Sequence, residues 1–199
     1  MQKKLLLLVF LATAIFSTGC IPRISPHTIQ RNTLPNTPPI TYPQVRNSSL
    51  PTFSYQKVQT VQGPVLTIGS NRTGFLFPDF KGKIILLEVF GQNCHFCMES
   101  LPSISYLHSK YRQNLQVVAL QVQEPMSKNK VNSLIQQFNI NYPIIDRANG
   151  SELMSVLKSN YEWTGSLPFT LLIKNGVTQQ VFTEQTNKKE MDRAIQELL

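Results

Sequence analysis

Residues 83–102 read KIILLEVFGQNCHFCMESLP, an apolar run followed by a short turn and two cysteines two residues apart. A nearly continuous apolar run of about seven residues is typical of a strand buried on both faces. A C-x-x-C pair beside such a strand is typical of a dithiol/disulfide active site, because one helical turn brings both sulfurs within bonding distance. The stretch therefore predicts a reactive Cys94 at a helix N-terminus, where the helix dipole stabilises a thiolate, and a more buried, resolving Cys97. A metal-binding or structural cysteine pair is the alternative.

The wider stretch 80–102 resembles the thioredoxin superfamily, and more narrowly its TlpA/ResA-like periplasmic thiol-disulfide proteins. This stretch and the TlpA/ResA-like pattern share a Gly-Lys turn, an apolar strand, C-x-x-C and a proline five residues after the second cysteine, which is Pro102 here. Residues 165–176, GSLPFTLLIKNG, resemble the later stretch in which this fold places a cis-proline facing the active site. The resemblance covers roughly residues 60–199. It implies an α/β fold with a thioredoxin-like mixed sheet flanked by helices and an added N-terminal β-hairpin.

The resemblance also assigns roles to particular residues. Glu88, six residues before Cys94, matches a buried carboxylate that helps to deprotonate the resolving cysteine in thioredoxins. Pro168 matches the cis-proline, and its neighbour Leu167 would hydrogen-bond a partner chain in the substrate groove. The alternatives are a strand-end Glu88 that reaches solvent and an ordinary turn proline.

The residues between the cysteines are expected to tune the redox potential. A protonated His95 would stabilise the neighbouring thiolate and make the protein more oxidising, whereas a solvated neutral histidine would have little effect. Strongly oxidising relatives carry histidine directly before the second cysteine, where this chain has Phe96.

Two positions depart from the TlpA/ResA-like pattern. Its glutamate three residues after the second cysteine is replaced by Ser100, and the tryptophan usual before the first cysteine is replaced by Asn93. Glu99 lies one residue before the position of the family's glutamate. It is interpreted as a favourable charge in the first helical turn. Both departures argue against the cytochrome-maturation subgroup specifically.

Composition limits the classes of partner. The 199 residues carry a net charge of +8 and are 41% hydrophobic, enough for one core beside its appendages. The basic residues are scattered along the chain rather than clustered, so no nucleic-acid partner is expected.

The N-terminus resembles a bacterial export signal that ends in a lipobox. Residues 1–19 contain Lys3 and Lys4 followed by an apolar run of 12 residues, which is short for a membrane span of about 20. Ser-Thr-Gly-Cys then predicts lipidation of Cys20, with an ordinary cleaved signal or an uncleaved anchor as the alternatives. Lipidation would leave Cys94 and Cys97 as the only free cysteines, as in an exported protein whose one disulfide is functional.

Residues 20–54 are expected to form a tether. Seven of the chain's 13 prolines lie there among polar residues, so little apolar surface could be buried. The domain is then assigned to residues 55–199. Periodicity and turn residues predict strands at 55–61, 64–68, 84–90, 115–123, 142–145, 169–174 and 177–182, and helices at 95–111, 131–138, 152–159 and from Thr186 or Asn187 to the end.

The sequence thus predicts a periplasmic thiol-disulfide oxidoreductase, anchored by lipid on Cys20 to the inner or the outer membrane. It would exchange disulfides with protein cysteines without a bound cofactor or metal. The resemblance favours a reductant that is itself re-reduced by a membrane partner, with apocytochrome c as one substrate. A disulfide-introducing oxidase or isomerase is the first alternative. A copper chaperone of the same fold is the second, although no histidine follows His108 to supply a third ligand.

Overall fold

The computed structural model describes residues 52–183 and 187–199. The predicted signal, Cys20 and all but the last three residues of the predicted tether lie outside the described residues. The elements in chain order are β1 (Ser54–Gln59), β2 (Val65–Asn71), β3 (Gly74–Leu76), the 3-10 turn η1 (Pro78–Phe80), β4 (Ile84–Phe90), α1 (His95–Lys110), β5 (Leu115–Gln121), α2 (Lys128–Phe138), β6 (Ile144–Ile145), α3 (Ser151–Tyr161), β7 (Phe169–Lys174), β8 (Val177–Thr183) and α4 (Lys188–Glu197).

A five-stranded mixed sheet in the order β6-β5-β4-β7-β8 forms the centre of the domain. The β6, β5 and β4 strands are parallel, and β7 and β8 add to β4 as an antiparallel hairpin. All seven residues of β4 are buried, which confirms the prediction of a central strand covered on both faces. The active-site turn therefore follows a strand that is held on both sides.

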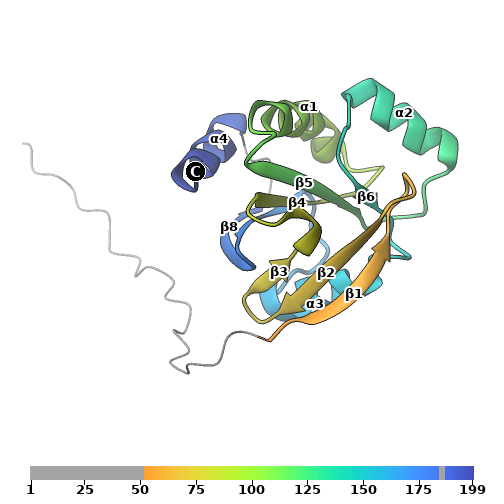
Figure 1. Ribbon diagram of the computed structural model, residues 1–199. Helices are drawn as coiled ribbons and strands as arrows, with labels where there is room; N and C mark the ends of the chain where they lie inside the picture. Colours follow the sequence, from red (N-terminus) through yellow and green to blue (C-terminus); the bar gives the residue numbers. More distant parts are fainter. Residues whose placement is uncertain (1–51, 184–186) are drawn as a thin grey trace, which may run out of the picture. The chain divides into compact units, whose positions relative to one another are not determined.

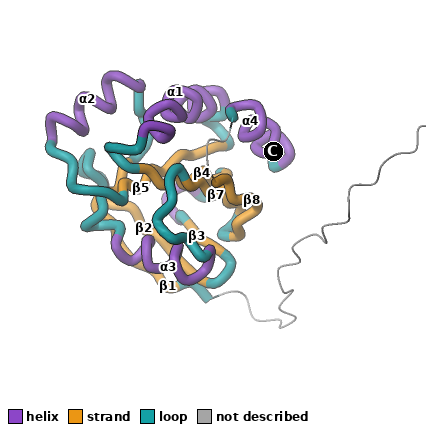
Figure 2. Tube along the Cα trace, turned by 180° about the vertical axis from the view of Figure 1, so that it is seen from behind, coloured by secondary structure: helices purple, strands orange, loops and turns teal. Residues whose placement is uncertain are grey.

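Helices and a second sheet cover the two faces of this sheet. In Figure 1, α1 and α4 lie together on one face with α2 beside them, whereas α3 and the small sheet β1-β2-β3 lie on the other. The view from behind in Figure 2 shows the same separation. Side chains alternate along β4, so Leu86 and Phe90 pack toward Leu101 of α1, while Leu87 and Val89 pack toward Leu157 of α3.

The predicted N-terminal hairpin is confirmed and extended by a third strand. β1 and β2 pair antiparallel, and β3 continues the sheet beyond a turn at Arg72 and Thr73. Gly74 begins β3 with φ +152°, and a Cβ there would lie 2.9 Å from the Gly176 carbonyl oxygen of the β7–β8 turn. The close approach of these two segments explains why this position carries no side chain.

The edge strand β6 is shorter than predicted. Pairing covers only Ile144 and Ile145, because Pro143 has no N–H to donate, although its carbonyl accepts the Ala119 N–H at 2.9 Å. The outer side of β6 is covered by the β1–β2 turn, since the Val61 N–H bonds the Ile144 carbonyl at 2.8 Å and Gln62 Oε1 accepts the Ile144 N–H at 3.0 Å. This contact removes an exposed sheet edge.

Ser127 caps α2, and its removal gives a first testable prediction. Its hydroxyl accepts the Lys130 N–H at 3.2 Å, and the first turn contains no acidic side chain that could support the helix dipole. We expect Ser127→Ala to lower the free energy of unfolding by about 1 kcal/mol in urea denaturation. The same change at exposed Ser133, inside the helix, should be neutral or slightly stabilising because alanine is the better helix former. Equal effects at both positions would contradict the capping role.

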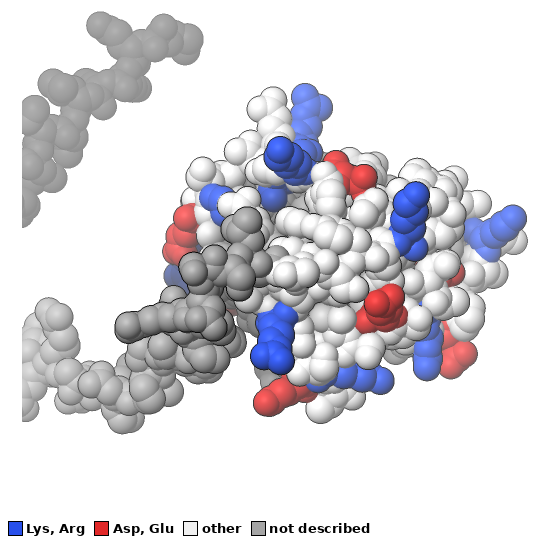
Figure 3. Space-filling model, turned by 60° about the horizontal axis from the view of Figure 1, so that its bottom comes forward, with Lys and Arg blue, Asp and Glu red and all other residues white. Residues whose placement is uncertain are grey.

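The charged side chains on the face drawn in Figure 3 are mixed in sign. Lysine and arginine side chains are spread over it and alternate with acidic ones.

Each helix in the described part of the chain is too short or too polar to span a membrane.

Candidate active site

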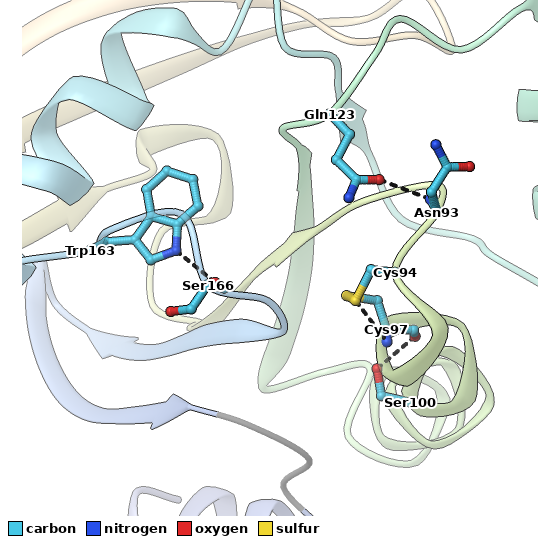
Figure 4. Close-up of a disulfide and its surroundings, with 7 residues drawn as sticks. All are labelled: Asn93, Cys94, Cys97, Ser100, Gln123, Trp163 and Ser166. Atoms are coloured by element: carbon cyan, nitrogen blue, oxygen red, sulfur yellow. Dashed lines mark hydrogen bonds between the residues drawn. A yellow bond between two sulfur atoms is a disulfide. The ribbon is translucent and has the colours of Figure 1, made fainter.

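The two cysteines lie where the sequence predicted, at the junction of β4 and α1. Cys94 is the N-cap of α1, with extended backbone angles, and its Sγ accepts the Cys97 N–H at 3.2 Å. The turn before it is closed by a bond from the Cys94 N–H to the Gly91 carbonyl at 3.1 Å. The two sulfurs form a disulfide with a Cα–Cα distance of 5.2 Å (Figure 4). The sulfur of Cys94 thus accepts one of the N–H groups of the first turn that have no partner within the helix.

The two sulfurs differ in their access to solvent. Cys94 is half-buried, whereas Cys97 is completely buried in the core cluster that contains Leu101. A partner molecule can therefore approach Cys94 but not Cys97. This asymmetry suits a pair in which one thiol attacks a partner and the other acts only inside the protein.

Glu88 lies in the middle of β4, paired in register with Ala119 of β5 and Thr170 of β7. It is completely buried, and among the described residues neither carboxylate oxygen has a hydrogen-bond partner. Because side chains alternate along a strand, it shares the α1 face with Leu86 and Phe90, which pack in the cluster of Cys97. Burial raises the pKa of Glu88 to about 8, so the group can hold or release a proton near neutral pH.

The loop before β7 forms the other border of the site. The Leu167–Pro168 peptide bond is cis, and Leu167 is half-buried against the cluster of Cys97. The Trp163 indole N–H donates to the Ser166 carbonyl at 2.8 Å, as Figure 4 shows. The indole is itself buried beside the Phe169 ring, so it connects this loop to the core.

Comparisons with known proteins agree with this geometry. No protein-family model matches the chain. The thiol-disulfide oxidoreductase ResA of Geobacillus kaustophilus is 32% identical over 123 residues, which cover 60% of this chain and 66% of that relative. Thioredoxin-like protein YneN of Bacillus subtilis is 26% identical over 119 residues, which cover 59% of this chain and 66% of the relative. The matches thus span just under two thirds of these relatives.

Solved structures show the same fold. A thiol:disulfide interchange protein of the thioredoxin family from Chlorobium tepidum aligns with a TM-score of 0.59 at 19% identity, over 76% of this chain and 98% of that one. A secreted Mycobacterium tuberculosis disulfide oxidoreductase homologous to DsbE aligns with a TM-score of 0.53 at 15% identity, over 71% of this chain and 95% of that one. The chain has the thioredoxin-like fold of these structures. Its curated relatives are mainly ResA-type thiol-disulfide oxidoreductases, as the two sequence signatures predicted.

The thioredoxin-type C-x-x-C of this chain presents both intervening side chains to solvent. The His95 side chain is 79% exposed, and its Nε2 lies 3.1 Å from Glu99 Oε1 one turn further along α1. The Phe96 residue is 49% exposed beside the disulfide. The first turn of α1 contains no acidic residue, so the interpretation of Glu99 as a first-turn charge is wrong and its contact is with His95.

A buried polar group formed by Tyr142, Ser105 and His108 was missed by the sequence interpretation, and its Tyr142 interacts with Glu88. Tyr142 and Ser105 are buried, and burial together with the Glu88 charge raises the pKa of Tyr142 well above its ordinary value. The His108 ring is buried against Tyr142, and its Nδ1 lies 2.7 Å from Asn141 Oδ1. Only the helical spacing of Ser105 and His108 with Leu101 could have shown that they face the core.

The thioredoxin-like site is a thiol pair without a surrounding ligand cluster. Within residues 52–183 and 187–199, no group of three or more histidine, cysteine, aspartate or glutamate side chains could hold a metal ion.

Proposed function

We propose that this chain is a thiol-disulfide oxidoreductase that exchanges disulfides with protein cysteines through Cys94 and Cys97. The observation that carries the proposal is the unequal access of the two sulfurs, with Cys94 half-buried at a helix N-terminus and Cys97 completely buried. The names of the curated relatives support the same reaction class. No bound cofactor is needed, because the cysteine pair carries both electrons.

In the reducing direction, the Cys94 thiolate attacks one sulfur of a partner disulfide. A mixed disulfide forms, and the other partner sulfur leaves as a thiolate. Cys97 then loses its proton and attacks Cys94 Sγ, which closes the Cys94–Cys97 bond and releases the second partner sulfur. Two electrons pass to the partner, and the chain is oxidised from dithiol to disulfide.

Glu88 is the proposed acceptor of the Cys97 proton. Both groups are completely buried on the α1 side of β4, where water cannot take the proton directly. A carboxyl group with a pKa of about 8 is matched to proton transfer near neutral pH. The loop of Leu167 and Pro168 would align the extended partner chain beside Cys94.

We further propose that the protein works outside the cytoplasm as a reductant. The lipobox-like sequence at Cys20 and the proline-rich residues 20–54 support a domain tethered to the inner or the outer membrane. A disulfide in apocytochrome c is the substrate class that the TlpA/ResA resemblance implies, and a membrane redox partner would restore the dithiol.

The exposed His95 favours a second candidate, a disulfide-introducing oxidase. A positive charge beside Cys94 would stabilise the thiolate and hence the reduced form, which makes a dithiol pair a stronger oxidant.

Equilibration with glutathione buffers would decide between the two directions. The full chain with Cys20→Ser is suitable, because Cys94 and Cys97 are then its only thiols. We expect a reduction potential below about −220 mV, in the range of reductants such as thioredoxin. A value above about −150 mV would instead support the oxidase. The absence of a reversible couple would overturn the proposed function.

A further inference from the structure

The turn that precedes Cys94 is bonded to the loop that follows β5. Gln123 Oε1 accepts the Asn93 backbone N–H at 2.8 Å, a bond drawn in Figure 4. Beside it, the Gln92 side chain donates to the Glu124 carbonyl at 3.1 Å. Two side-chain amides, one from each segment, therefore connect the two loops next to the nucleophile.

This contact arises from the parallel pairing of β4 and β5. Phe90 pairs in register with Gln121, and the Val122 N–H bonds the Phe90 carbonyl at 3.0 Å, so both strands end at the same edge. The Gln123 side chain then lies across the backbone of Gly91. A Cβ on Gly91 would lie 2.2 Å from Gln123 Cδ and 2.4 Å from its Oε1, so the position has no room for a side chain.

We propose that Gln123 is a positioning residue for Cys94, holding the turn through Asn93 so that the sulfur stays at the N-terminus of α1. The inference rests on the proposed thiol-disulfide exchange and adds a residue from outside the C-x-x-C segment to it. Gly91 is part of the same arrangement, because the absence of a side chain at this position leaves the space that the Gln123 side chain occupies.

The bond matters more in the reduced state than in the oxidised one. In the disulfide, the covalent link to Cys97 holds Cys94 in place. In the dithiol that link is absent, so the turn has a larger share in keeping the sulfur beside the N–H groups of α1, which stabilise a thiolate. Loss of the Gln123 contact should therefore raise the pKa of the Cys94 thiol and make the reduction potential more negative.

Gln123→Met tests this inference, because methionine fills similar space over Gly91 but cannot accept the Asn93 N–H. Gln123→Ala removes both the packing and the bond, and Gln136→Ala on the exposed side of α2 is the matched control. All are made in the full chain with Cys20→Ser. We expect Gln123→Met and Gln123→Ala to shift the equilibrium with glutathione toward the disulfide by about two- to tenfold, the range for one hydrogen bond. Thiolate absorbance measured across pH should show a raised pKa of Cys94 in both variants.

A double-mutant cycle with Gly91→Ala makes the test specific. The added methyl group must displace the Gln123 side chain, so Gly91→Ala alone should reproduce the redox shift of Gln123→Ala. In the Gln123→Ala background it should add nothing further, since no side chain is left to displace. Additive effects would overturn the inference.

The possible failures are distinguishable. Suppose that the Cys94/Cys97 couple is reversible in the chain with intact Gln123, and that Gln123→Met lowers only the melting temperature. Gln123 is then structural, so the inference is wrong while the proposed function stands. If the chain with intact Gln123 shows no reversible couple, the proposed function fails, and the inference fails with it.

Discussion

Cys94→Ser is expected to reduce disulfide exchange to the uncatalysed background. A serine hydroxyl is not ionised near neutral pH and cannot form the mixed disulfide, and the buried Cys97 cannot reach a partner in its place. The measurement is the rate at which the dithiol form reduces a disulfide-bonded protein substrate. Cys20→Ser is the matched control, which should react at the rate of the unmodified chain.

Cys97→Ser should fail at the second step instead. The half-buried Cys94 can still attack, so the mixed disulfide forms but is not resolved, and a covalent adduct of chain and partner accumulates. Mass spectrometry under non-reducing conditions would detect this adduct. Full turnover by Cys97→Ser, or an adduct formed through Cys97 in the Cys94→Ser chain, would contradict the assigned roles.

Glu88→Gln is expected to remove a large part of the pH dependence of stability. The pKa of Glu88 is about 8 in the folded chain against an ordinary value of 4.5, so the folded state holds this proton more tightly than the unfolded state. Its contribution to stability is therefore complete below pH 4.5 and is lost as the pH rises to about 8. At about 1.4 kcal/mol per pH unit, the difference amounts to about 5 kcal/mol.

Urea unfolding of the oxidised protein between pH 4.5 and pH 9 would measure this effect. The unmodified chain should lose stability steadily over most of this range, and Glu88→Gln should lose much less, because the amide does not ionise. Glu124→Gln, at an exposed position in the loop after β5, is the control and should follow the unmodified chain. Parallel curves for Glu88→Gln and the unmodified chain would show that Glu88 has an ordinary pKa.

The same substitution should slow the resolving step of the reaction. Without a carboxylate to accept the Cys97 proton, the buried thiol is a poorer nucleophile, so the mixed disulfide should persist longer.

Several features of the fold and the site could be predicted because they depend on local sequence. The mostly apolar β4, the helix that starts after Cys94 and the hairpin across Asn175 and Gly176 follow from periodicity, capping and turn chemistry. The two signatures at 80–102 and 165–176 then predicted the thioredoxin-like fold, which the solved structures show. The resemblance to thioredoxins implied a buried Glu88, and the structure shows it completely buried.

The tertiary structure alone decided which distant residues support the site. Gln123 reaches Asn93 only because β4 and β5 pair in parallel and end at one edge. Tyr142 comes near Glu88 from the far side of β5, and no spacing in the sequence links the two residues.

The sequence by itself determined that this chain builds a strand, a turn and a helix around a C-x-x-C pair, because these preferences act over a few neighbouring residues. The folded chain determined the environment of that pair: the exposure of each sulfur, the pKa of Glu88 and the bonds that hold the turn. Desolvation and hydrogen bonding depend on every atom within a few ångströms, and most of those atoms come from segments that only strand pairing and core packing bring together.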